Sequence, residues 1–99
     1  MVAAGAIDAR DRERVLSRLA AAGRHVEIID ALQMAGFAGN VLELRAADSG
    51  SVLAMSAAAH AALGPGAIER LASTVNRMVV APIPTIETLG GGSVRCMLA

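Results

Sequence analysis

Residues 40–55 read Asn40-Val41-Leu42-Glu43-Leu44-Arg45-Ala46-Ala47-Asp48-Ser49-Gly50-Ser51-Val52-Leu53-Ala54-Met55, and this stretch decides the fold that the sequence predicts. In residues 40–45 leucine alternates with charged residues, which is typical of a half-buried strand. Gly50 can adopt a positive φ at low cost, so the chain is expected to turn here. Residues 40–45 and 52–55 therefore predict an antiparallel β-hairpin.

A helix and a third strand are expected after the hairpin. Ser56 can cap a helix, which Gly64-Pro65 splits because glycine ends one segment and proline is tolerated in the first turn of the next. Residues 78–81 predict another buried strand, and Pro82 ends it because proline cannot donate to a sheet ladder. The resulting order is β-β-α-β.

The residues before the hairpin predict a helix followed by a strand. Residues 8–22 are typical of an amphipathic helix, and residues 24–30 of a strand on which Val26 and Ile28 share the face covered by that helix. Residues 31–39 are expected to be a looser connection. The order α then β matches the second half of a β-β-α-β module, so we expect an α/β fold of about one and a half modules.

Length and composition limit the function. Ninety-nine residues suffice for one small domain, and nine basic residues balance nine acidic ones. This zero charge argues against nucleic acid as a partner. The longest apolar run, residues 52–63, is shorter than the roughly 20 residues that span a bilayer, so no membrane association is expected. A single cysteine and an N-terminus without signal features favour the cytoplasm.

No metal or cofactor is expected from the sequence. His25 and His60 have no cysteine or carboxylate at ligand spacing, so both are interpreted as structural or exposed residues. The run Gly90-Gly91-Gly92 lacks the glycine spacing, the lysine and the following helix of a nucleotide-binding loop.

The segment most suggestive of chemistry contains this glycine run and Cys96. Glycines cost backbone entropy, so their run predicts a close approach of the chain to a ligand or to another backbone. The positive charge of Arg95 would favour the Cys96 thiolate if it points towards the sulfur. The alternative is that Cys96 is a small buried apolar residue.

Several runs together resemble the C-terminal third of amidinotransferase-like proteins of the citrulline-utilisation hydrolase type, relatives of arginine deiminase and dimethylarginine dimethylaminohydrolase. These runs are Phe37 to Arg45, Met55-Ser56, Pro82 to Glu87, and Gly90 to Met97. The resemblance implies a partial pentein fold, the α/β propeller of five β-β-α-β modules. Residues 1–38 would be the second half of one module, and residues 39–99 the last module with the cysteine loop, within a single partial domain.

The resemblance also implies the chemistry. Cys96 would be the catalytic nucleophile of a hydrolase or amidinotransferase acting on a guanidino or ureido compound, such as citrulline or an arginine derivative. Its loop would be shaped, and substrate bound, by the residues around it: Gly90, Gly91, Gly92, Ser93 and Arg95. Arginine deiminases carry an arginine at the position of Gly91, so their mode of substrate recognition does not transfer.

The resemblance implies that the site is shared with other modules. In the family a histidine and carboxylates from earlier modules complete the active site, and both ends of this chain look truncated, so the isolated chain is expected to be inactive. Its partners would be a complementing chain or a second copy. One alternative is a non-catalytic α/β module that pairs through an open strand edge. Another is a remnant without a stable fold.

Overall fold

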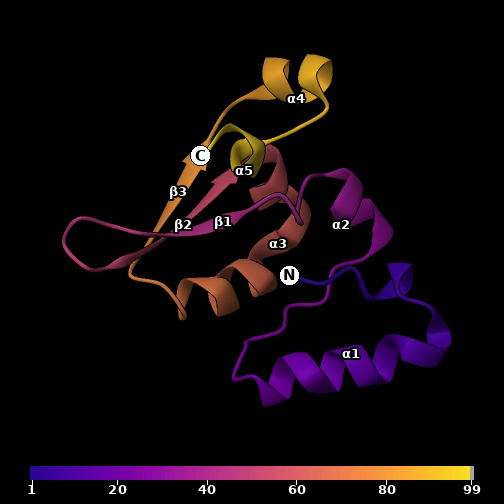
Figure 1. Cartoon of the computed structure of the whole chain (residues 1–99). Coiled ribbons are helices and arrows are strands. Elements are labelled where there is room, and N and C mark those ends of the chain that lie inside the picture. Colours follow the sequence, from indigo (N-terminus) through magenta and orange to yellow (C-terminus); the bar gives the residue numbers. More distant parts are fainter. Residues whose placement is uncertain (99) are drawn as a thin grey trace.

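Three strands form one mixed sheet in the computed structural model, which describes residues 1–98 (Figure 1). They are β1 (Leu42–Arg45), β2 (Ser51–Ser56) and β3 (Arg77–Ala81), in the order β1-β2-β3. β1 pairs with β2 antiparallel, with Glu43 opposite Leu53, and β2 pairs with β3 parallel. The predicted hairpin and the third strand are therefore confirmed, and β2 lies in the centre.

Helix α3 (Ala57–Ala72) connects β2 to β3 and covers one face of the sheet. The Ser56 hydroxyl accepts a hydrogen bond from the backbone N–H of Ala59, 3.1 Å away, which confirms the predicted cap. Gly64 has a φ of 73° and kinks the helix, so the predicted division is confirmed. The core between helix and sheet is built from apolar side chains of both, with two contributions from the preceding segment: Ile29, Ala38, Leu53, Met55, Ala59, Leu63, Ala67 and Leu71.

Helix α1 (Ala9–Ala21) begins where the sequence predicts, because the Asp8 carboxylate accepts a hydrogen bond from the backbone N–H of Arg10 at 2.9 Å. A short 3-10 turn, η1 (Ala4–Ala6), precedes it. α1 lies along the outside of the molecule (Figure 1), and none of its own residues is fully buried. Its apolar stripe is thus only partly covered.

The predicted strand at residues 24–30 is wrong. Only a single bridge forms, between Val2 and Ile28. The side chains that turn inwards are those of Glu27 and Ile29, whereas Ile28, placed on the covered face by the sequence pattern, is 55% exposed. A charged residue faces inwards here because it has a partner on a distant helix, which periodicity alone does not reveal.

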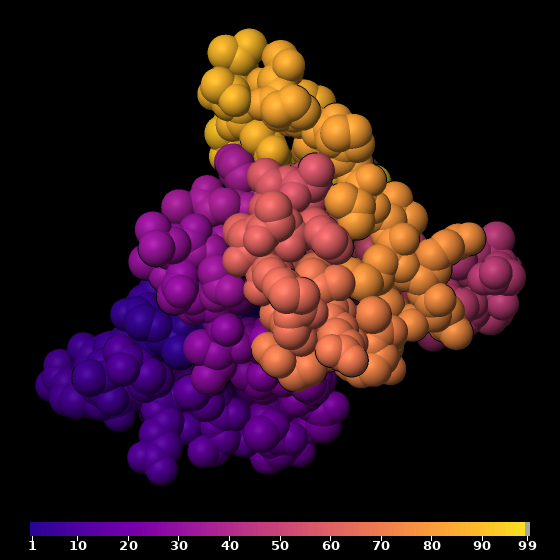
Figure 2. Space-filling model, turned by 180° about the vertical axis from the view of Figure 1, so that it is seen from behind, coloured from indigo at the N-terminus to yellow at the C-terminus, as the bar shows by residue number. Residues whose placement is uncertain are grey.

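Three short helices were not predicted: α2 (Ala31–Ala35), α4 (Pro84–Gly90) and α5 (Val94–Met97). At α2 the Asp30 and Gln33 side chains form a reciprocal capping box, a signal present in the sequence. β3 ends before Pro82, as expected, but the chain then enters α4 with a proline in its first turn. Figures 1 and 2 show α4, in orange to yellow, projecting at the end of the sheet where β2 and β3 end.

The inward-facing Glu27 carboxylate ties the N-terminal segment to α3. Glu27 is 7% exposed, and the Arg70 guanidinium donates two hydrogen bonds to it, one of them from Nε to Oε2 at 3.1 Å. The His25 Nε2 atom lies 3.6 Å from the same Oε2. The hydrogen bonds from Arg70 hold the pKa of Glu27 below its ordinary value, against the opposing effect of burial.

The stabilisation from this ion pair is expected to vanish in acid. Because the pKa of Glu27 is lower in the folded chain than the 4.5 of a free glutamate, the stabilisation is complete above pH 4.5 and is lost as the pH falls through the lowered value. The difference between the urea midpoints of wild type and Glu27→Gln should therefore be smaller at pH 3 than at pH 7. Glu13→Gln on the exposed face of α1 is the control and should follow wild type at both pH values. A difference for Glu27→Gln that is as large at pH 3 as at pH 7 would contradict the assignment.

Candidate functional site

Cys96 lies on α5, and its side chain is exposed. Helix α5 packs on β2, and its Val94, which is 8% exposed, lines an apolar cavity together with Val52 and Ala54 of that strand. The backbone N–H of Cys96 donates to the carbonyl oxygen of Ser93 at 2.9 Å, which closes the single turn. The sheet thus holds the short helix, and the helix presents the thiol to solvent.

Asn40 contacts this cysteine from the other end of the β-β-α-β unit. Its Nδ2 donates a hydrogen bond to the Cys96 sulfur at 3.0 Å, and its Oδ1 accepts one from the backbone N–H of Arg95 at 2.9 Å. Because Leu42 pairs with Ala54 antiparallel, the residues just before β1 lie beside the carboxyl end of β2, where α5 packs. Sequence reasoning gave Asn40 no role, although it belongs to one of the runs that carry the resemblance.

The glycine run has three different local roles. Gly90 is the last residue of α4, and Gly91 caps it with a φ of 65°, in the left-handed region. At Gly92 an added Cβ would lie 3.2 Å from both Cβ and Sγ of Cys96. The close approach that the sequence predicts therefore exists, but its neighbour is the cysteine side chain itself.

Ser93 links the glycine run to α4. Its side chain is fully buried, and its hydroxyl donates to Oε1 of Glu87 at 2.7 Å. Ser93 precedes α5 without capping it through its side chain, because the hydroxyl is already engaged with Glu87. This contact holds the loop before Cys96 in place, and Glu87 is a second residue that sequence reasoning did not assign.

Hydrogen bonding favours the thiolate form of Cys96. The hydrogen bond from Asn40 is the largest cause that lowers the pKa of this thiol, and a backbone hydrogen bond from Ser93 is the next. Desolvation opposes them, and the charge of Arg95 lowers the pKa least. The effect expected of Arg95 thus has the predicted sign, but Asn40 dominates. A thiolate is the nucleophilic form of cysteine.

A cavity of about 340 Å³ borders the site. Asn40 and Gly91 line it, together with residues from the first 39 positions of the chain: Met1, Ala3, Ile29, Met34, Phe37 and Gly39. Its size suits a small molecule. The cavity is therefore a candidate place for a substrate next to the thiol.

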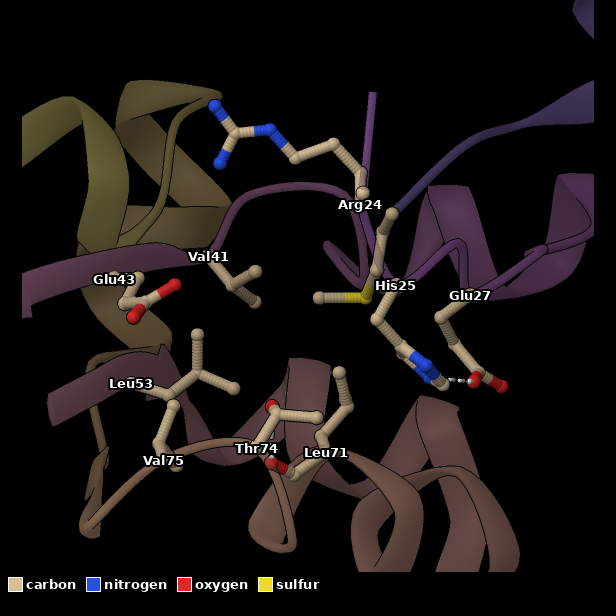
Figure 3. A pocket seen from close by; sticks show the side chains of 11 residues that line it. Arg24, His25, Glu27, Val41, Glu43, Leu53, Leu71, Thr74 and Val75 are labelled. Carbon is tan, nitrogen blue, oxygen red and sulfur yellow. Dashed lines mark hydrogen bonds and ion pairs between the residues drawn. The ribbon is translucent and has the colours of Figure 1, made fainter. Parts of the chain in front are cut away.

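The two histidines do not contact the cysteine. Figure 3 shows His25 beside Glu27 on one side of another cavity, of about 380 Å³, with Glu43 on its opposite side. His60 lies half-buried on α3. Within residues 1–98, neither histidine forms a hydrogen bond with Cys96.

Residues 1–98 contain neither a cluster of metal ligands nor a helix that could span a membrane. No three histidine, cysteine, aspartate or glutamate side chains gather there in a way that could hold a metal ion. Among the helices of residues 1–98, none has the length and apolar character needed to cross a membrane.

Residues 1–99 match the model of the family described as N,N dimethylarginine dimethylhydrolase, eukaryotic. The chain belongs to this family. The N,N dimethylarginine dimethylhydrolase family lies in the amidinotransferase and arginine deiminase superfamily, so the superfamily resemblance is confirmed, and the mixed α/β sheet is compatible with part of a pentein fold. Neither the curated proteins nor the solved structures gave a match. The citrulline-utilisation type and the number of modules stay predictions.

Proposed function

We propose that this chain supplies the nucleophile of a hydrolase that acts on the guanidino group of N,N-dimethylarginine or a closely related compound. The observation that carries the proposal is the Cys96 thiol, held by Asn40 and Gly92 in a member of a family named for this hydrolysis. The hydrogen-bonded sulfur has the electronic character that a covalent mechanism requires.

In the proposed reaction the Cys96 sulfur attacks the central guanidinium carbon. The bond between this carbon and the dimethylated nitrogen breaks, and dimethylamine leaves with a proton. Water then attacks the thiouronium carbon, and the carbon–sulfur bond breaks to return the thiolate. The net change replaces dimethylamine by oxygen, so a guanidino group becomes a ureido group.

The guanidino substrate is favoured over a ureido one. A guanidinium carries positive charge at the carbon that the thiolate attacks, whereas the ureido group of citrulline is neutral and less electrophilic. A citrulline-like substrate and transfer of the amidino group to an amine in place of water are the remaining variants of the same chemistry. Both would use Cys96 in the same role.

The proton transfers need groups beyond those around Cys96. A leaving amine must gain a proton, which a histidine usually supplies, and carboxylates usually hold planar nitrogens by paired hydrogen bonds. Within residues 1–98 no histidine contacts Cys96. We therefore propose that the proton donor lies outside residues 1–98 and that these residues alone do not turn over substrate.

The test is covalent labelling by 2-chloroacetamidine, which resembles a guanidinium and loses chloride without needing a proton donor. In the native state Cys96 is expected to react at least about tenfold faster with it than with neutral 2-chloroacetamide, after normalisation to the same ratio in urea. Because the chain has one cysteine, intact mass reports this site alone. Equal normalised rates would contradict the proposed substrate class.

A second candidate function, non-catalytic pairing with another copy of this chain, is favoured by one observation. The sheet face left open by α3 carries an apolar cavity of about 300 Å³, bordered by exposed Leu44, Val79, Met97 and Leu98. The balanced charge imposes no repulsion between copies. Such a module would sediment as a dimer at micromolar concentration and would show no amidine preference, so the two functions are separable.

A further inference from the structure

The orientation of the Asn40 amide is fixed by its two hydrogen bonds. A backbone N–H can only donate, so the group that faces Arg95 N, 2.9 Å away, must be the carbonyl oxygen Oδ1. The amino group Nδ2 is then turned towards the Cys96 sulfur, 3.0 Å away. The sulfur is therefore on the accepting side of this contact, the side on which a thiolate is the stronger partner.

We propose that Asn40 is the positioning residue of the cysteine nucleophile: Nδ2–H holds and stabilises the sulfur anion, while Oδ1, bound to the backbone of Arg95, keeps the amide from turning over. Its relevance to hydrolysis rests on the proposed function, whereas its effect on the thiol does not. Asn40 acts through Cys96 and needs no contact with the substrate.

This arrangement gives Asn40 a role in both the first and the last step of the covalent reaction. The sulfur loses its negative charge when it bonds to the guanidinium carbon, and it regains that charge when water expels it. The amide hydrogen bond is strong with the anion and weak with the neutral thioether. Asn40 thus keeps the thiolate available before attack and makes it a better leaving group at the end.

Few other groups near Cys96 compete with this role. Arg95 is adjacent in sequence, and Glu87 approaches the site through its bond with Ser93. β2, the strand on which α5 packs, contributes Ser51 to Ser56, which contain no charged side chain. The neutral amide of Asn40 is therefore the side-chain contact to the sulfur, beside the backbone hydrogen bond from Ser93. Arg95 and Glu87 are the charges to control for.

Two substitutions distinguish the effects of the two hydrogen bonds that the Asn40 amide forms. Asn40→Asp has almost the same shape and can still accept from the backbone of Arg95, but it cannot donate to the sulfur when ionised. Asn40→Ala removes both bonds without adding charge. The measurement is the rate of Cys96 alkylation by iodoacetamide as a function of pH, read by intact mass on the native chain.

The alkylation midpoint is expected to rise in the order wild type, Asn40→Ala, Asn40→Asp. For a midpoint that rises by one pH unit, the rate at pH 7 falls about tenfold and recovers in alkali, a recovery that a merely structural defect would not give. Arg95→Gln should move the midpoint less than Asn40→Ala does. In urea all variants should react alike.

Equal midpoints for native wild type and either folded variant would overturn the assignment. This result is independent of the labelling by 2-chloroacetamidine. If the substitutions shift the alkylation midpoint but Cys96 shows no preference for the amidine, the role of Asn40 stands and the proposed substrate class is rejected. If Cys96 prefers the amidine but the alkylation midpoints are equal, the substrate class stands and the role of Asn40 is rejected. Urea unfolding of each variant shows which of the two substitutions is folded and can be used.

Discussion

Replacing Met55 by alanine is expected to remove a large fraction of the chain's stability at 25 °C. Met55 is fully buried on β2, the central strand, and packs against α3. Truncation of a buried methionine costs about 2–5 kcal/mol, because apolar contacts are lost and a cavity remains. A domain of this length has a total stability of about 5–15 kcal/mol. This chain should lie at the lower end, since α1 adds no buried residue to the core.

The measurement is urea unfolding followed by far-UV circular dichroism, with two controls. Met34→Ala removes the same side chain from α2, where it is 50% exposed, and should change stability by less than about 0.5 kcal/mol. Met55→Leu conserves volume and should cost less than about 1.5 kcal/mol. Equal effects of Met34→Ala and Met55→Ala would show that the core is not centred on β2.

Alanine substitutions along the glycine run are expected to have three distinct effects. At Gly92 the new methyl group would meet the Cys96 sulfur at 3.2 Å, so the cysteine side chain must shift, and we expect this shift to weaken its hydrogen bond with Asn40. We expect Gly92→Ala to slow native alkylation of Cys96 at pH 7 by about tenfold, because the sulfur loses its hydrogen-bond donor. The stability of the fold should change little, since the clash is with an exposed side chain.

The two neighbouring glycines serve as matched controls. Gly91 has a φ of 65°, so Gly91→Ala should lower stability by about 1–2 kcal/mol, the usual cost of a left-handed alanine. At Gly90 an added Cβ meets only Ile86 at 3.9 Å, an ordinary contact, and Gly90→Ala should affect neither property. If Gly90→Ala and Gly92→Ala slowed alkylation equally, the close approach at Gly92 would not explain the glycine requirement.

Much of the fold was predictable because its signals are local. The alternation in residues 40–45, the turn between the two hairpin strands and the helix break at Gly64 each arise within a few residues, and all three are confirmed. The positive φ expected at Gly50 lies instead at Ser49, with a φ of 66°. The segment at residues 24–30 failed for the opposite reason. Its inward-facing Glu27 is compatible with burial only because Arg70 pairs with it from 43 positions away.

The candidate site was predictable only in part, for a similar reason. The glycine run next to Cys96 pointed to a constrained loop, and the family match supports the superfamily on which the choice of Cys96 rested. Asn40 stayed unassigned because its contact with the sulfur spans 56 positions. The charge of Arg95, which is adjacent in sequence, was an obvious candidate, yet its effect on the thiol is smaller than that of the distant amide.

The long-range hydrogen bond between Asn40 and Cys96 also couples the reactivity of the thiol to folding. Its two partners lie at opposite ends of the hairpin, helix and third strand, and they meet only after all of these have assembled. An unfolded or half-folded chain carries a thiol with the sluggish reactivity of free cysteine at neutral pH. The thiol is therefore expected to react faster once the sheet is complete, so that alkylation at neutral pH reports on the last folding step.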